Sequence, residues 1–78
     1  MTVGEQLKKM RIKAGYTIKD VVDMADGNIE ISGISRIENN ERKPSLIAAY
    51  CMSEIYDVDL MEIAKMHCGK VKIKKLKK

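Results

Sequence analysis

The stretch that decides the fold is Thr17-Ile-Lys-Asp-Val-Val-Asp-Met-Ala-Asp-Gly-Asn-Ile-Glu-Ile-Ser-Gly-Ile-Ser-Arg-Ile-Glu38. Thr17 and Asp20 have the spacing of a capping box, in which each side chain accepts the other's backbone N–H, so a helix begins after Thr17. Residues 26–28, Asp-Gly-Asn, are a strong turn signal that ends this helix. A second helix is predicted over residues 31–38, because Ile34 and Ile37 lie three residues apart on one face. Two short helices joined by a turn have the outline of a helix-turn-helix.

Three further helices are predicted around this pair. One runs from Gly4 to about Lys13 and ends at Gly15, the residue type that most often follows a helix end. Another follows the cap Ser45 and extends to about residue 56. Its expected buried stripe is Leu46, Ala49, Met52 or Ser53, and Tyr56.

The fifth helix is predicted from Leu60 to about His67, with Asp59 and Glu62 as its capping pair. No stretch alternates apolar and polar residues for long enough to predict a sheet. The sequence therefore predicts an all-α, compact five-helix domain over residues 1–68, followed by a lysine-rich tail over residues 69–78.

Length and composition limit what this domain can be. Its 78 residues, 45% hydrophobic and without Phe or Trp, suffice for one small domain with an aliphatic core. No run approaches the roughly 18 apolar residues that a membrane span requires. The N-terminus has no basic-then-apolar export signal. We therefore expect a cytoplasmic protein that does not bind membranes.

Few residues offer catalytic or metal-binding chemistry. Cys51, His67 and Cys68 are scattered and lack a paired Cys-x-x-Cys, so we expect no metal site. A single His, dispersed acids and no Gly-rich phosphate loop supply no pair of nucleophile and base, so we do not expect an enzyme. The sequence also indicates no cofactor and no small-molecule ligand.

The net charge of +4 is unevenly distributed along the chain. Residues 70–78 contain six lysines and no acid, so the tail carries +6 and the rest of the chain 4 − 6 = −2. Residues 5–19 sum to +4, whereas residues 20–30 sum to −4. A nucleic-acid-binding protein presents a basic face, and the candidates here are the first helix, residues 36–43 and the tail.

Three segments of the chain, in order, resemble one known family. Ile34-Ser-Arg-Ile-Glu-Asn-Asn-Glu-Arg-Lys-Pro-Ser45 is similar to the segment joining the third and fourth helices of repressor/Cro-type (XRE-like) helix-turn-helix domains of phage and bacterial transcriptional regulators. Met10-Arg-Ile-Lys-Ala-Gly-Tyr-Thr17 resembles the end of that family's first helix. Asp57-Val-Asp-Leu60 resembles its turn into the fifth helix. The resemblance covers about residues 4–66.

This resemblance implies roles for individual residues. The helix over residues 31–38 would enter the DNA major groove with its N-terminal side chains at base edges. The implied base contacts are Ile31, Ser32, Ser35 and Arg36. The implied phosphate contacts are Asn39, Arg42 and Lys43, with Thr17 and Lys19 flanking one further anchor position. Arg11 and Glu38 would form a buried structural pair that clamps the first helix to the end of the third.

A homodimer is expected as well, because one domain of this size makes few base contacts and two copies on a palindromic operator gain specificity. We expect the dimer interface on the fifth helix, at Leu60, Met61, Ile63 and Ala64. Tyr56 and the tail residues Val71, Ile73 and Leu76 are further candidates.

Three features depart from the family pattern. Ile18 stands where the family commonly has a Gln that reaches a phosphate. The turn over residues 26–31 is about two residues longer than usual. Gly33 offers no side chain to a base and costs about 1 kcal/mol relative to Ala in a helix.

Two functions remain open at this point. The leading one is a sequence-specific transcriptional regulator whose partner is double-stranded DNA. The alternative is an antitoxin-like or adaptor module that keeps the fold for protein interaction and has weakened DNA reading, which the acidic residues 20–30 and Ile18 favour.

Overall fold

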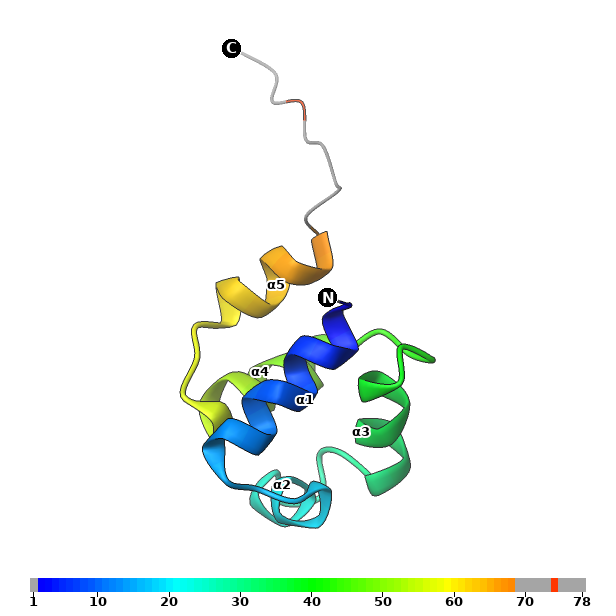
Figure 1. Ribbon diagram of the computed structural model, residues 1–78, viewed down its shortest axis with the longest axis vertical. Helices are drawn as coiled ribbons and strands as arrows, with labels where there is room; N and C mark the ends of the chain where they lie inside the picture. The colour runs from blue at the N-terminus through cyan, green and yellow to red at the C-terminus, as the bar shows by residue number, and fades with distance from the viewer. Residues whose placement is uncertain (1, 69–73, 75–78) are drawn as a thin grey trace.

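The computed structural model describes residues 2–68 and Lys74, and this part of the chain contains five α-helices (Figure 1). They are α1 (Val3–Ala14), α2 (Ile18–Met24), α3 (Ile31–Glu38), α4 (Leu46–Tyr56) and α5 (Leu60–Cys68). The predicted all-α class is confirmed, and the observed helix ends lie within two residues of the predicted ones. The predictions for Val71, Ile73 and Leu76 lie outside the described residues.

The helix boundaries follow from the capping residues. Thr17 and Asp20 form the complete capping box of α2, with N···O distances of 3.1 Å from the Asp20 N–H and 2.9 Å from the Thr17 N–H. Ser45 Oγ accepts the Ala48 N–H at 3.1 Å at the start of α4. Gly15 ends α1 in the left-handed conformation, with φ at 87°, and its N–H donates to the carbonyls of Arg11 and Ile12.

The longer turn between α2 and α3 does not change where α3 begins. Asp26 and Gly27 both adopt positive φ, at 51° and 82°, which reverses the chain within two residues. The Asn28 side chain then donates to the Ala25 carbonyl at 2.8 Å. Ile29 is buried in the core, so the turn is anchored at its far end. The start of α3 at Ile31 is the one that the sequence predicts.

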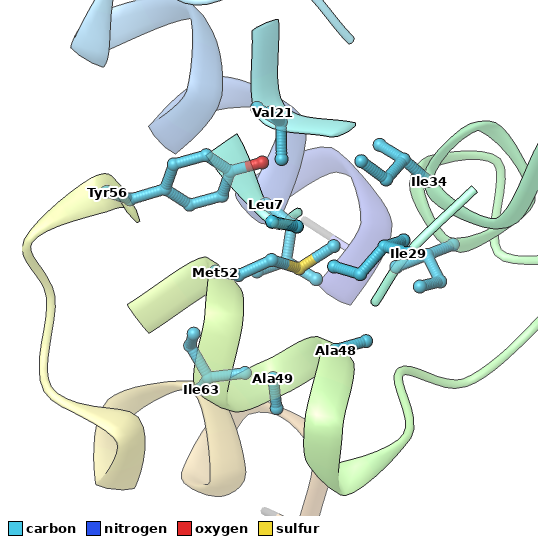
Figure 2. Close-up of a cluster of buried hydrophobic side chains, with 11 residues drawn as sticks. Leu7, Val21, Ile29, Ile34, Ala48, Ala49, Met52, Tyr56 and Ile63 are labelled. Atoms are coloured by element: carbon cyan, nitrogen blue, oxygen red, sulfur yellow. The ribbon is translucent and has the colours of Figure 1, made fainter. Parts of the chain in front are cut away.

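Each of the five helices contributes to a single core (Figure 2). The five largest fully buried side chains come one from each helix: Leu7, Val21, Ile34, Met52 and Ile63. A small chain buries only a modest fraction of its surface. Truncating the buried side chain of any one helix therefore weakens the packing of the other four helices.

The buried side of α4 confirms the predicted stripe at Ala49, Met52, Ser53 and Tyr56 but not at Leu46. Leu46 is 78% exposed, whereas Ala48 is buried together with Ala49 and Met52. The prediction for Leu46 is wrong because the face of α4 that meets the core is centred on the small residues 48 and 49, which allow close helix approach. Leu46 lies about a third of a turn around the helix from that centre.

Two residues that were predicted for the dimer interface lie inside the domain. Ile63 is 1% exposed and Tyr56 is 7% exposed, and both pack in the core that the five helices share. Neither side chain is free to contact a second copy, so these two predictions are wrong. Leu60 and Ala64 are half-buried and Met61 is exposed.

No helix within residues 2–68 is both long and apolar enough to cross a membrane. The described residues also contain no group of three or more His, Cys, Asp or Glu side chains arranged to hold a metal ion.

Candidate nucleic-acid interface

α3 turns one edge to the core and the other to solvent. Ile34 and Ile37 are 0% and 3% exposed, so they fix the helix against α1 and α2. Ile31, Ser32 and Arg36 lie on the outer side, and Ser35 is half-buried at its margin. In Figure 1 the helix lies at the edge of the molecule, beside α1. Of the four residues that the family resemblance assigns to base edges, three are therefore exposed and Ser35 is half-buried.

The guanidinium of Arg36 forms no ion pair within the part of the chain that the structure describes. Its backbone carbonyl accepts the Glu41 N–H at 2.8 Å, which holds the chain close to the end of α3. The side chain is exposed on the outer surface of the helix, so all five guanidinium donors are available to an acceptor outside the protein.

Arg42 brings a second guanidinium to the same helix. Its Nη1 lies 3.5 Å from the position that a Cβ on Gly33 would occupy, and Ile29 Cγ2 lies 3.6 Å from that position. Gly33 is buried, so this position does not belong to the outer side of α3, and Arg42 lies beside it. Asn39 and Lys43 are also exposed on the segment that links α3 to α4.

The side chains at the N-terminus of α2 are less available to bind a phosphate than those on and after α3. Thr17 and Lys19 are exposed as predicted, but Thr17 is engaged with Asp20, and Lys19 Nζ lies 3.2 Å from Asp23 Oδ2. Hydrogen bonds from the backbone and side chain of Thr17 hold the pKa of the Asp20 carboxyl below its ordinary value. A carboxylate therefore occupies the first turn of α2, where the helix dipole favours an anion. An exposed Lys–Asp pair is worth little, so Lys19 remains able to exchange partners.

A buried ion pair joins α1 to the last turn of α3. Arg11 Nε donates to Glu38 Oε2 at 2.7 Å, and Nη2 donates to Oε1 at 3.1 Å. A third donor, Nη1, reaches the Tyr16 carbonyl at 2.8 Å. The hydrogen bond with Glu38 raises the pKa of Arg11 above its ordinary value. The structure thus brings together the two residues that the family resemblance assigns to a structural clamp.

Asn40 forms a second clamp at the end of α3 that the sequence analysis does not predict. Asn40 adopts a left-handed conformation, with φ at 62°. Its Oδ1 accepts the Gly4 N–H at 2.9 Å, and its Nδ2 donates to Thr2 Oγ1 at 2.8 Å. A Cβ on Gly4 would lie 2.4 Å from the Glu38 carbonyl oxygen, so only glycine fits there. The sequence signal was a glycine in the first turn of a helix, which has no helical reason to be there.

Tyr56 lies close enough to Arg11 and Glu38 for their charges to act on its phenol. Burial raises the pKa of its phenol to about 12, with a smaller contribution from the Glu38 charge. Its hydroxyl is buried, points inward toward Val21 in Figure 2, and has no hydrogen-bond partner among the described residues. The phenol therefore acts as an apolar packing group that keeps its proton.

Comparison with known protein families finds a match to this arrangement of helices. A family model described as a helix-turn-helix (HTH_3) matches residues 7–63. The matched segment begins at Leu7 in α1 and ends at Ile63 in α5, so it includes α2, α3 and α4 in full and parts of α1 and α5. No curated protein and no solved structure gives a significant match to the chain.

Proposed function

Because the chain belongs to the Cro/C1-type (XRE) helix-turn-helix family, a family of DNA-binding domains, we propose that it is a transcriptional regulator that reads a specific sequence in double-stranded DNA. Families of this domain are generally non-enzymatic. The observation that carries the proposal is the outward side of α3, where Arg36 is exposed and unpaired while Ile34 and Ile37 anchor the helix to the core.

In this proposal α3 enters the major groove and its outer side chains meet base edges. Arg36 has the bidentate geometry that recognises the O6 and N7 acceptors of guanine. Ser32 offers a short hydroxyl that suits several bases, and Ile31, 55% exposed, suits a thymine methyl group. Ser35 is half-buried, so its contribution is limited to a base or sugar that approaches the helix closely.

Affinity in this proposal comes mainly from the segment after α3. Asn39, Arg42 and Lys43 are exposed there, and neither basic side chain is paired within the described residues. Thr17 and Lys19 add weaker phosphate contacts, since the carboxylate of Asp20 accepts the Thr17 backbone N–H and that of Asp23 pairs with Lys19. Each phosphate that is neutralised releases counterions, so affinity falls steeply as salt is raised.

We further propose that two copies bind a palindromic operator. One α3 helix presents four side chains at most, which is too few to specify a site among many competing sequences. A symmetric dimer doubles the contacts and places the half-sites about one DNA turn apart.

Selection of bound duplexes from a random pool tests the proposal. We expect enrichment of a palindromic consensus, and a loss of affinity of at least about a hundredfold between about 50 and 200 mM salt. A pool that stays random after repeated rounds, together with a flat salt response, would contradict the proposal.

The acidic surface around α2 favours the alternative of a protein-interaction module with the same fold. Asp20, Asp23 and Asp26 are all exposed there. The selection experiment separates the two functions, because such a module would enrich no consensus sequence.

A further inference from the structure

A hollow of about 560 Å³ opens between the turn before α3, the inner side of α3 and the start of α4. Part of its lining belongs to the core, since Ile29, Ile37 and Ala48 are 7%, 3% and 6% exposed. Small-molecule sites in proteins have volumes of this order, and an apolar lining with a few polar groups is typical of them. The hollow therefore has the size and the apolar surface of a ligand site.

Two features in which the chain departs from the pattern of its family meet at this hollow. The long turn between α2 and α3 lines it with residues 27–30. Gly33 lines it without a side chain, and a Cβ there would lie 3.5 Å from Arg42 Nη1. A longer side chain at residue 33 would therefore extend into the space beside that guanidinium. Gly33 is buried, so its small size serves the hollow and not a base contact.

The charged residues around the hollow favour an anion. Arg42 and Lys43 supply two positive charges, and Glu30 supplies one negative charge. All three side chains are exposed, and none forms an ion pair within residues 2–68. A guanidinium binds a carboxylate through two parallel hydrogen bonds, so Arg42 is the group best suited to hold one here.

The apolar lining distinguishes this site from a simple phosphate contact. Arg42 Nη1 and Ile29 Cγ2 lie 3.5 and 3.6 Å from the same point beside Gly33, so a charged donor and an apolar side chain meet there. An inorganic phosphate would use the donor alone. A carboxylate attached to a hydrocarbon group would use both.

We propose that this hollow binds a small organic acid, with the carboxylate on Arg42 and the hydrocarbon part against Ile29 and Ala48. The inference rests on the proposed function for one consequence, which is the effect on DNA. Arg42 and Lys43 are also predicted phosphate contacts, so an acid bound in the hollow competes with the DNA backbone. Such coupling is reciprocal, because DNA must weaken the binding of the acid by the same factor.

The sequence alone indicates no small-molecule ligand because the lining comes from three separate segments. These are residues 27–30, 33–37 and 42–48, which only the fold brings together.

Amide NMR of the full chain without DNA tests the site, with sodium benzoate and sodium hexanoate as probes. We expect both to cause saturable shifts at the backbone amides of Asn28, Ile29, Gly33 and Arg42. Their Kd should lie in roughly the millimolar range that ligands of so few atoms reach. Benzylammonium chloride has the same ring with the opposite charge and should bind at least about tenfold more weakly than benzoate.

Two outcomes of this titration would overturn the inference. One is the lack of saturable shifts with either acid up to tens of millimolar. The other is inorganic phosphate shifting the same amides as strongly as benzoate, which would make the hollow a general anion site.

Variants of the lining locate the binding. Gly33→Leu fills the hollow and should weaken benzoate binding by at least about tenfold. Gly33→Ala is the matched control, since its Cβ makes only ordinary contacts at 3.5 and 3.6 Å, and it should still bind benzoate. Arg42→Gln keeps the apolar lining and should also weaken benzoate binding by at least about tenfold, so the test does not depend on Gly33→Leu alone. Circular dichroism verifies that each variant is folded. Benzoate binding that neither Gly33→Leu nor Arg42→Gln weakens would contradict the site.

The effect on DNA is measured last, at an ionic strength matched with sodium chloride. Saturating benzoate should weaken operator binding by the wild type and leave that of Gly33→Leu unchanged. Benzoate binding without any effect on the operator would overturn the competition. A chain that binds benzoate but selects no consensus would keep the site and contradict the proposed function. A consensus without benzoate binding would keep the function and contradict the site.

Discussion

Arg11 and Glu38, 27 residues apart in the chain, form a bidentate ion pair whose side chains are only 10% and 5% exposed. The pair joins the C-terminal half of α1 to the last turn of α3. A few residues away, Asn40 joins the N-terminal end of α1 to the chain that leaves α3. These two contacts hold the C-terminal end of α3, the proposed DNA-reading helix, against both ends of α1.

Glu38→Ala should destabilise the domain by about 3–5 kcal/mol, because it leaves the Arg11 guanidinium buried without its counter-charge. This is a large part of the stability expected for a chain of this size. Urea denaturation followed by circular dichroism measures the effect. Glu41→Ala removes an exposed acid three residues further on and should change the unfolding free energy by less than about 0.5 kcal/mol. Similar losses in the two variants would contradict the buried clamp.

Gly4→Ala should destabilise the domain by about 1–3 kcal/mol, although Ala is normally the better helix former. The added Cβ would lie 2.4 Å from the Glu38 carbonyl oxygen and 2.6 Å from that of Ile37, and both are backbone atoms that cannot rotate away. Gly33→Ala is the matched control, since its nearest atoms would lie at 3.5 and 3.6 Å. The control should be neutral or stabilising by up to about 1 kcal/mol. Thermal denaturation compares the two, and equal melting temperatures would disprove the close approach at Gly4.

Tyr56 should make the protein sensitive to alkali. Its folded pKa is raised to about 12 from an ordinary value of 10.0, so the folded state binds its proton more tightly than the unfolded state. The resulting stability is complete below pH 10 and is lost as the pH rises from 10 toward 12. Tyr56→Phe should lack this loss, and near neutral pH it should cost less than about 1 kcal/mol, because the hydroxyl has no hydrogen-bond partner within the described part of the chain. Parallel alkaline curves for the two proteins would contradict the burial of the phenol.

The capping box of α2 should weaken in acid. The pKa of Asp20 is lowered in the folded state, so its contribution to stability is present above the ordinary value of 3.8 and is lost as the pH falls through the folded pKa. Asp20→Asn cannot titrate and should show a shallower loss of stability over that range. The difference between the two acid unfolding curves is the measurement, and coincident curves would exclude the carboxylate as a cap.

The helices were predictable because their signals are local. Thr17 with Asp20, Ser45 and Gly15 each stop or start a helix through groups a few residues away, and the structure confirms all three. Ile34 and Ile37 were predictable for the core because three-residue spacing places them on one face whatever the partner helix is.

The errors concern contacts that the sequence does not encode locally. Leu46 and Ile63 are both apolar helix residues, and which of them is buried depends on how α4 and α5 are placed against the other helices. The same holds for Asn40, which binds residues of α1 that precede it by 36 and 38 positions. Arg42 reaches Gly33 through the fold of the loop, which no short-range pattern specifies.

The most direct measurement of the central claim is the binding of wild-type and Arg36→Ala protein to the selected operator and to a shuffled duplex, each over a range of salt. We expect Arg36→Ala to lose about 1–3 kcal/mol on the operator and much less on the shuffled duplex, so that specificity falls at one base position. Arg42→Ala, as the control, should weaken both duplexes alike and reduce the salt slope by about one per subunit. If Arg36→Ala keeps the affinity and the sequence preference of the wild type, α3 does not read the major groove.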